Sequence, residues 1–209
     1  MQCAIQRRSV YLAPTATMDR HWIARLFDDP SIHPMFGFKD PAGALMGMRM
    51  KEDPDLIVGT IRLSRFQARI GFVLMFPPTA LLDFWEFGYA ITAAKHRNAF
   101  NAVNAMDAMA HYTMDLRGLP VVGGRTRDDN RAAAAIALRS GHKPAFNRPF
   151  EGHDYTFWTL DQAGWARRKQ RLAQGEAEHP WTGGGQVFHV LDSPPYTPVP
   201  PLDVARQDA

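Results

Sequence analysis

The chain has 209 residues, of which 45% are hydrophobic and 22% are charged, and its formal net charge is +3. This composition predicts one globular domain with a substantial core, and the charge is too small to indicate nucleic acid or an anionic membrane as a partner. The single cysteine, Cys3, excludes an intrachain disulfide and fits a reducing compartment. The first residues lack the apolar core of a secretory signal, and the longest apolar run, residues 71–76, is too short to span a membrane. We therefore expect a cytoplasmic protein.

The first third of the chain predicts a strand at residues 9–13 and a helix at residues 17–27, which begins at a Thr-Met-Asp cap. Residues 31–38 predict a loop with a partial second helix. Residues 44–50 and 55–63 predict two antiparallel strands joined by a polar turn. The following segment, residues 66–82, contains the apolar run 71–76 and predicts an extra strand or hairpin that covers the sheet edge; an apolar wall of a binding site or a dimer contact is the alternative.

The central stretch, residues 83–106, combines three elements in close succession. Residues 84–91 are bulky, aromatic or β-branched and predict a strand. A polar loop at residues 94–98 follows, and then a helix with apolar residues three or four apart. A helix that begins directly after a strand and a tight loop presents unpaired backbone N–H groups and its positive dipole end to an anion. A phosphate-bearing ligand is therefore the first hypothesis.

The rest of the chain predicts a strand at residues 121–126 and an alanine-rich helix that Asn130 opens and Ser140-Gly141-His142 closes. Residues 143–150 and 155–160 predict the last two strands. Residues 162–174 predict a basic helix with a solvated face, and a Gly183-Gly184-Gly185 hinge leads into a Pro-rich end. We therefore divide the chain into a domain at 1–160 and an appendage at 161–209.

This order of elements resembles the cofactor core of the GNAT superfamily, the N-acyltransferases that use acyl-CoA, and is most similar to the branch with the ribosomal-protein N-terminal acetyltransferases. The resemblance covers the chain to about residue 160. It implies an α/β fold with a mixed, mostly antiparallel sheet of six to seven strands and helices on both faces. It also implies transfer of an acyl group, most simply acetyl, from acetyl-CoA or another acyl-CoA to an amine on a small molecule or peptide, without a metal.

The family's phosphate-loop pattern is Arg/Gln-x-x-Gly-x-Gly/Ala, and this chain has Phe100 in place of the middle glycine. Glycine lets the backbone approach the pyrophosphate closely, whereas the side chain of Phe100 must swing aside or occupy the place of the phosphate. The resemblance implies a set of cofactor-binding residues from the strand, the loop and the start of the next helix: Ala90, Ile91, Arg97, Asn98, Ala99, Phe100, Asn101, Ala102 and Asn130.

Glu86 is the candidate catalytic base. Aromatic neighbours on the strand desolvate its carboxylate, which raises its pKa towards the range useful for a base, and its position matches the strand glutamate of many family members. A structural glutamate paired with an arginine is the alternative. The tyrosine that many members use to protonate the leaving thiolate corresponds to Ala137, and no other tyrosine is preferred in its place. A thiol with a pKa of about 8.5 leaves without full protonation.

The segment between the first two strands lines the acceptor side in this superfamily, which makes His33, Met35 and Phe36 candidate substrate contacts, with simple packing as the alternative. Three further alternatives stay open: a longer acyl donor or an acyl carrier protein, a non-catalytic GNAT-like binding protein, and a homodimer. The eight histidines show no metal-ligand spacing. The acceptor amine is not identifiable from the sequence.

Overall fold

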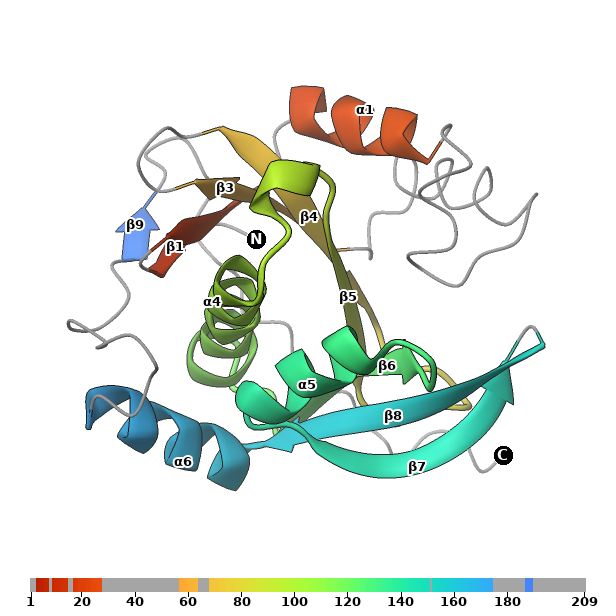
Figure 1. The fold of residues 1–209 in the computed structure, drawn as a ribbon. Helices are drawn as coiled ribbons and strands as arrows, with labels where there is room; N and C mark the ends of the chain where they lie inside the picture. Colours follow the sequence, from red (N-terminus) through yellow and green to blue (C-terminus); the bar gives the residue numbers. More distant parts are fainter. Residues whose placement is uncertain are drawn as a thin grey trace, which may run out of the picture.

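The computed structural model describes residues 3–7, 9–14, 17–27, 57–63, 68–150, 152–174 and 187–189. These residues build one sheet with the strand order β7-β8-β6-β5-β4-β3-β2-β1-β9 (Figure 1). Its strands are β1 (Cys3–Arg7), β2 (Val10–Pro14), β3 (Ile57–Leu63), β4 (Arg69–Phe76), β5 (Trp85–Ile91), β6 (Val121–Arg127), β7 (Lys143–Phe150), β8 (His153–Asp161) and β9 (Val187–His189). Among the strands of the described residues, only β5 and β6 run parallel.

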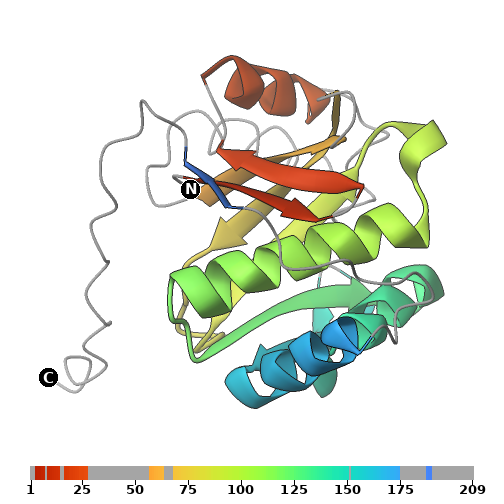
Figure 2. The same ribbon diagram turned by 90° about the vertical axis from the view of Figure 1, so that its left-hand side faces the viewer.

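Helices cover both faces of this sheet, as Figures 1 and 2 show. The helices are α1 (Thr17–Leu26), α4 (Ala99–Ala110), α5 (Arg131–Arg139) and α6 (Gln162–Ala173), with a 3₁₀ turn η1 (Ala94–His96) and a π-helical turn η2 (His111–Leu116). The predicted mixed sheet with helices on both faces is confirmed. Beyond the seven strands β2–β8, the short strands β1 and β9 extend one edge.

Each face of the sheet has its own core. On one face, which we call the α1 face, Ile23 of α1 and Phe27, directly after that helix, pack on Phe72 and Leu74 of β4. On the other, the α4 face, the buried residues of α4 and α6 pack on the same strands, including Val73 of β4. Because neighbouring residues of a regular strand point to opposite faces, these two cores assign residues 72–76 of β4 and all residues of β5 to a face.

Strand β4 contains the apolar run 71–76, and its position corrects the sequence prediction. It pairs with β3 on one edge and β5 on the other, so it is a central strand and not a cover for the sheet edge. Both of its faces are buried, by α1 and by α4, which is why its residues are apolar without alternation. Residues 71–75 are therefore buried core, and only Phe76 at the end of the run is partly exposed.

Helix α6 lies in the predicted appendage and packs tightly on α4. Trp165 is 1% exposed, and Arg168 forms a two-pronged ion pair with Asp107 of α4, at 2.8 and 3.0 Å. The prediction of a fully solvated basic face was thus wrong at Arg168. The predicted strand at 44–50 and the predicted loop at 31–38 lie outside the described residues. No helix in the described ranges is long and apolar enough to span a membrane.

Candidate active site

The sheet opens between its two parallel strands. β5 and β6 pair only through Trp85–Val122 and Glu86–Gly123, after which they diverge while β6 continues to pair with β8. At the start of the opening, a Cβ atom on Gly124 would lie 2.8 Å from the carbonyl oxygen of Phe87, so only glycine allows the strands to lie this close. A cleft of about 640 Å³ occupies the opening.

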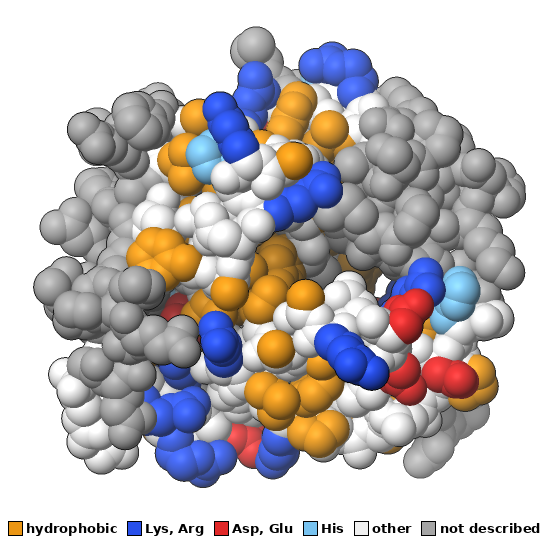
Figure 3. All heavy atoms as spheres, in the orientation of Figure 1, with side chains coloured by type: hydrophobic (Ala, Val, Ile, Leu, Met, Phe, Trp, Pro, Cys, Tyr) orange, Lys and Arg blue, Asp and Glu red, His pale blue; other side chains and the backbone are white. Residues whose placement is uncertain are grey.

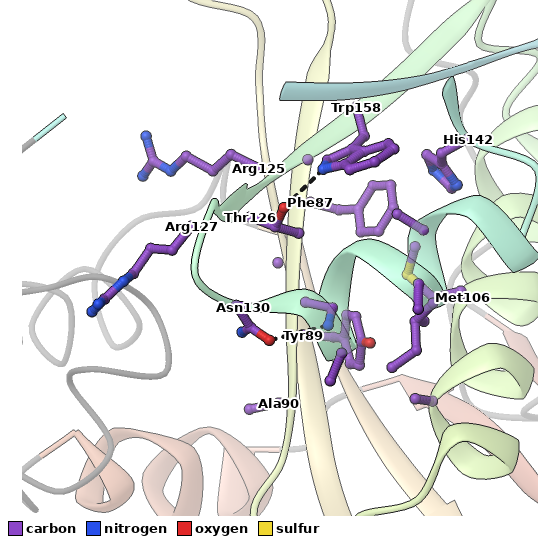
Figure 4. A pocket seen from close by; sticks show the side chains of 18 of the residues that line it. Phe87, Tyr89, Ala90, Met106, Arg125, Thr126, Arg127, Asn130, His142 and Trp158 are labelled. Carbon is purple, nitrogen blue, oxygen red and sulfur yellow. Dashed lines mark hydrogen bonds between the residues drawn. The ribbon is translucent and has the colours of Figure 1, made fainter. Parts of the chain in front are cut away.

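This cleft connects the two faces of the sheet. Phe87 and Tyr89 reach it on the α4 face, whereas Glu86 and Arg125 reach it on the α1 face. Figure 4 shows Arg125 and Arg127 extending to the side opposite Phe87 and His142. In Figure 3, hydrophobic side chains line the hollow between α4 and α5, and Lys and Arg side chains surround it. The cleft is thus apolar in its depth, with one carboxylate and several guanidinium groups at its borders.

The loop between β5 and α4 has a fixed shape. Asn98 is the N-cap of α4 and accepts a hydrogen bond from the N–H of Asn101, at 2.8 Å. Arg97 donates to the carbonyl oxygens of Ile91 and Thr92, at 2.8 and 2.9 Å, and so fastens the loop to the end of β5. The helix N-terminus beyond this cap faces the cleft through Ala99 and Ala102, in the geometry that suits a phosphate.

Two residues of the predicted cofactor set have side chains elsewhere. Phe100 is not among the residues that line the cleft, and its side chain is 37% exposed on the outside of α4. Asn101 is 5% exposed; its amide donates to the carbonyl of His96 and accepts from the hydroxyl of Ser9. Phe100 therefore leaves the space in front of the helix open, and Asn101 holds the loop in place. The other predicted cofactor residues line the cleft: Ala90, Ile91, Arg97, Asn98, Ala99, Ala102 and Asn130.

Small side chains on α5 keep the cleft wide. Asn130 caps this helix by accepting from the N–H of Ala133, at 3.1 Å, and leaves its own amide N–H groups available to a ligand. Ala133 and Ala137 line the cleft where longer side chains would fill it. Tyr89 and Tyr155 also line the cleft; Tyr89 enters it on the α4 face, and burial raises the pKa of its phenol to about 12. Tyr89 is therefore a neutral hydroxyl donor there.

Glu86 lies where the opening begins. Its carboxylate is 15% exposed, and Arg125 contacts it through Nε at 3.3 Å. Burial raises the pKa of Glu86, and the guanidinium of Arg125 counteracts part of that rise. The sequence offered two interpretations, a base and an arginine-paired structural residue. The structure shows the arginine pair, and the paired carboxylate also lines the cleft, so the catalytic role stays a prediction. His33, Met35 and Phe36, the predicted acceptor contacts, lie outside the described residues.

His142 lines the cleft on the α4 face and was not predicted as part of it. It lies edge-on to Phe87, with 5.5 Å between the ring centroids, and its Nδ1 lies 3.0 Å from the hydroxyl of Ser140. Desolvation lowers the pKa of His142 to about 4, so the ring is neutral at physiological pH. A sequence signal for this position existed, since it replaces the phenylalanine that the family usually shows at the end of this helix.

Comparison with known proteins identifies the family. Residues 9–143 match the model of the acetyltransferase (GNAT) domain. This chain belongs to the GNAT acetyltransferase family. It is accordingly a GNAT-type N-acyltransferase that depends on acyl-CoA. The match includes the opened strands, the capped loop and α5, which together form the cleft. It does not test the narrower resemblance to the ribosomal-protein branch.

Solved structures share the fold of this GNAT enzyme at low sequence identity. The spermidine N-acetyltransferase of Vibrio cholerae, in complex with CoA and spermine, is 16% identical with a TM-score of 0.63, over 77% of this chain and 99% of that one. A GNAT-family acetyltransferase of Bacillus anthracis is 12% identical with a TM-score of 0.60, over 77% and 99%. FdhC, a nucleotide-linked sugar GNAT, is 13% identical with a TM-score of 0.63, over 82% and 97%. No curated protein sequence matches the chain.

Proposed function

We propose that this GNAT enzyme transfers an acetyl group from acetyl-CoA to an amine acceptor, with Glu86 as the general base. One observation carries the proposal: the cleft passes through the sheet between β5 and β6, with Glu86 at its inner end. Donor and acceptor therefore approach the same point from opposite faces. The reacting atoms meet beside a desolvated carboxylate.

The donor enters along the α4 face. The N-terminus of α4, capped by Asn98, binds the pyrophosphate, and the pantetheine arm lies between β5 and the alanines of α5. Past Glu86, β5 has no strand partner on the side of β6 within the described residues, so its backbone groups are available to the arm's amides. The same free edge provides an N–H donor near Tyr89 for the oxyanion of the tetrahedral intermediate.

The acceptor reaches Glu86 along the α1 face. The amine nitrogen, as the neutral amine, attacks the thioester carbonyl carbon, the C–S bond breaks and CoA leaves as a thiolate. The proton lost by the nitrogen passes to Glu86, and the thiolate takes up a proton from solvent. The hydroxyl of Tyr89 stabilises the thiolate by a hydrogen bond before that protonation.

A carrier protein as donor has weaker support. It was motivated by a loop narrowed by Phe100 and by an apolar wall at residues 71–76. Phe100 lies outside the cleft, and residues 71–75 form the sheet core, so that Phe76 alone of this run reaches the cleft. A spermidine acetyltransferase is among the structural neighbours, which makes a small-molecule amine the first acceptor class to examine.

The test is calorimetric titration with acetyl-CoA and CoA, followed by an acceptor screen that measures released thiol. We expect acetyl-CoA to bind with a dissociation constant in the micromolar range and thiol release to require an amine. Absence of binding to both CoA and acetyl-CoA, with the protein folded, would contradict the proposal.

A further inference from the structure

Arg125 holds an unusual position for an arginine beside a candidate base. Its guanidinium approaches Glu86 most closely through Nε, at 3.3 Å, and its carbon Cζ lies 4.3 Å from the ring centre of Phe150 and 5.7 Å from that of Tyr155. Within the described part of the chain, its two terminal nitrogens hold no hydrogen bond. The aromatic rings fix the guanidinium plane without using its N–H groups. A rigid pair of donors thus remains available at the border of the cleft.

Two other arginines of this protein each bind a carboxylate through two nitrogens of the guanidinium. Arg127, two residues along the same strand and on the same face, binds Asp129 through Nε and a terminal nitrogen. Arg168 binds Asp107 in the same two-pronged manner. Arg125 has a carboxylate nearby but does not bind it in this way, because its closest approach to Glu86 is 3.3 Å and no hydrogen bond joins the two side chains in the described residues. Its terminal fork is therefore suited to a planar oxyanion from outside the chain.

Glu86 and Arg125 together present a negative and a positive group side by side on the α1 face of the cleft. From this geometry we propose that the acceptor is an α-amino acid, whose amino group lies at Glu86 as the neutral amine while its carboxylate binds the terminal nitrogens of Arg125. In such a molecule one carbon separates the two groups, which matches a pair of side chains in direct contact. The inference rests on the proposed function, since it places the reacting nitrogen at the base.

The same arrangement disfavours a polyamine. Its remaining ammonium groups have no partner at Arg125 and are repelled by the positive guanidinium. An acceptor amine without a carboxylate leaves the terminal nitrogens of Arg125 in water and lacks the charge-assisted hydrogen bonds to them. We expect that contact to change kcat/KM by about tenfold or more. Replacing Arg125 therefore tests which class of acceptor the enzyme prefers.

The experiment measures thiol release from acetyl-CoA with matched acceptors: α-amino acids against their carboxamides, glucosamine 6-phosphate against glucosamine, and spermidine. Each is assayed with the wild type, Arg125→Gln and Arg131→Gln. Arg131 is exposed on α5 and outside the cleft, so its replacement controls for the change in net charge. Calorimetric titration of the preferred amino acid into protein saturated with CoA gives a second readout.

We expect at least one amino acid to exceed its carboxamide about tenfold or more in kcat/KM, and Arg125→Gln, but not Arg131→Gln, to remove that preference and weaken amino-acid binding. Higher activity with carboxamides or with spermidine overturns the inference, as does a preference confined to the phosphate pair. Those results leave the proposed function intact. Failure to bind CoA overturns both.

Discussion

Two carboxylate–arginine pairs in this enzyme contain the same chemical groups but differ in burial and in hydrogen bonding. Asp107 and Arg168 lie in the contact between α4 and α6, 1% and 9% exposed, and are joined by two hydrogen bonds. Glu86 and Arg125 lie at the cleft, more exposed and joined only by one contact at 3.3 Å. In the first pair the two side chains bind each other through two hydrogen bonds and so link two helices. In the second pair the terminal nitrogens of Arg125 and the carboxylate of Glu86, whose pKa is raised, remain available to a ligand, which is the condition for binding and proton transfer.

The largest effect is expected from breaking the buried pair. Arg168→Ala leaves the carboxylate of Asp107 buried without its partner and should lower the free energy of unfolding by about 3–5 kcal/mol. Arg167→Ala, on the exposed side of the same helix, is the matched control and should change it by less than about 0.5 kcal/mol. Guanidinium denaturation of both variants measures this. Equal stabilities would show that α6 does not depend on the pair.

Replacing the other carboxylate should affect catalysis and spare the fold. Glu86→Gln keeps the shape and removes the base, so kcat should fall roughly 100-fold or more while acetyl-CoA affinity stays unchanged. Because burial raises the pKa of Glu86, its charged form costs stability at neutral pH, and the neutral glutamine should not lower the unfolding free energy. Normal turnover in this variant would make the cleft pair structural, like the buried one.

His142 is a buried titratable side chain whose pKa no neighbouring charge among the described residues shifts, and its effect on stability depends on pH. Its folded pKa of about 4 lies below the usual 6.5, so between these values the unfolded chain binds a proton that the folded chain does not. Stability is therefore lost as the pH falls from 6.5 towards 4, by about 2 kcal/mol at pH 5. In His142→Phe this part of the loss should vanish. Parallel unfolding curves at pH 7 and pH 5 measure it, and an unchanged pH dependence would contradict the assignment.

The smallest effect should come from the influence of Arg125 on its partner. The guanidinium lowers the pKa of Glu86 against the effect of burial, so Arg125→Gln should raise that pKa further. A base is active when deprotonated, and the acidic limb of the kcat/KM profile should therefore move to higher pH. A shift to lower pH would mean that another group sets this limb.

The sequence by itself determined the elements and the local chemistry of this protein. Alternation of apolar residues, helix caps and the order strand–loop–helix placed β5, α4, β6 and α5 close to their observed bounds, and the resemblance to the GNAT superfamily proposed Asn98 and Asn130 for the site beside Glu86. These signals are local: a cap such as Asn98 acts on an N–H three residues away. The aromatic residues expected to desolvate Glu86 instead face the other side of the sheet, and burial within the fold raises the pKa of Glu86.

Only the tertiary structure decided which faces meet. The sequence predicted a sheet edge or a binding-site wall for the run 71–76, whereas strands pair with it on both sides. It also predicted that Phe100 obstructs a phosphate, whereas the side chain of Phe100 lies outside the cleft. Arg125 and Glu86 are 39 positions apart, and Asp107 and Arg168 are 61 apart. Nothing in their local sequence distinguishes the arginine that stabilises from the one that is open to a ligand. The number of hydrogen bonds each makes depends on burial and on the relative placement of strands and helices, which long-range packing sets.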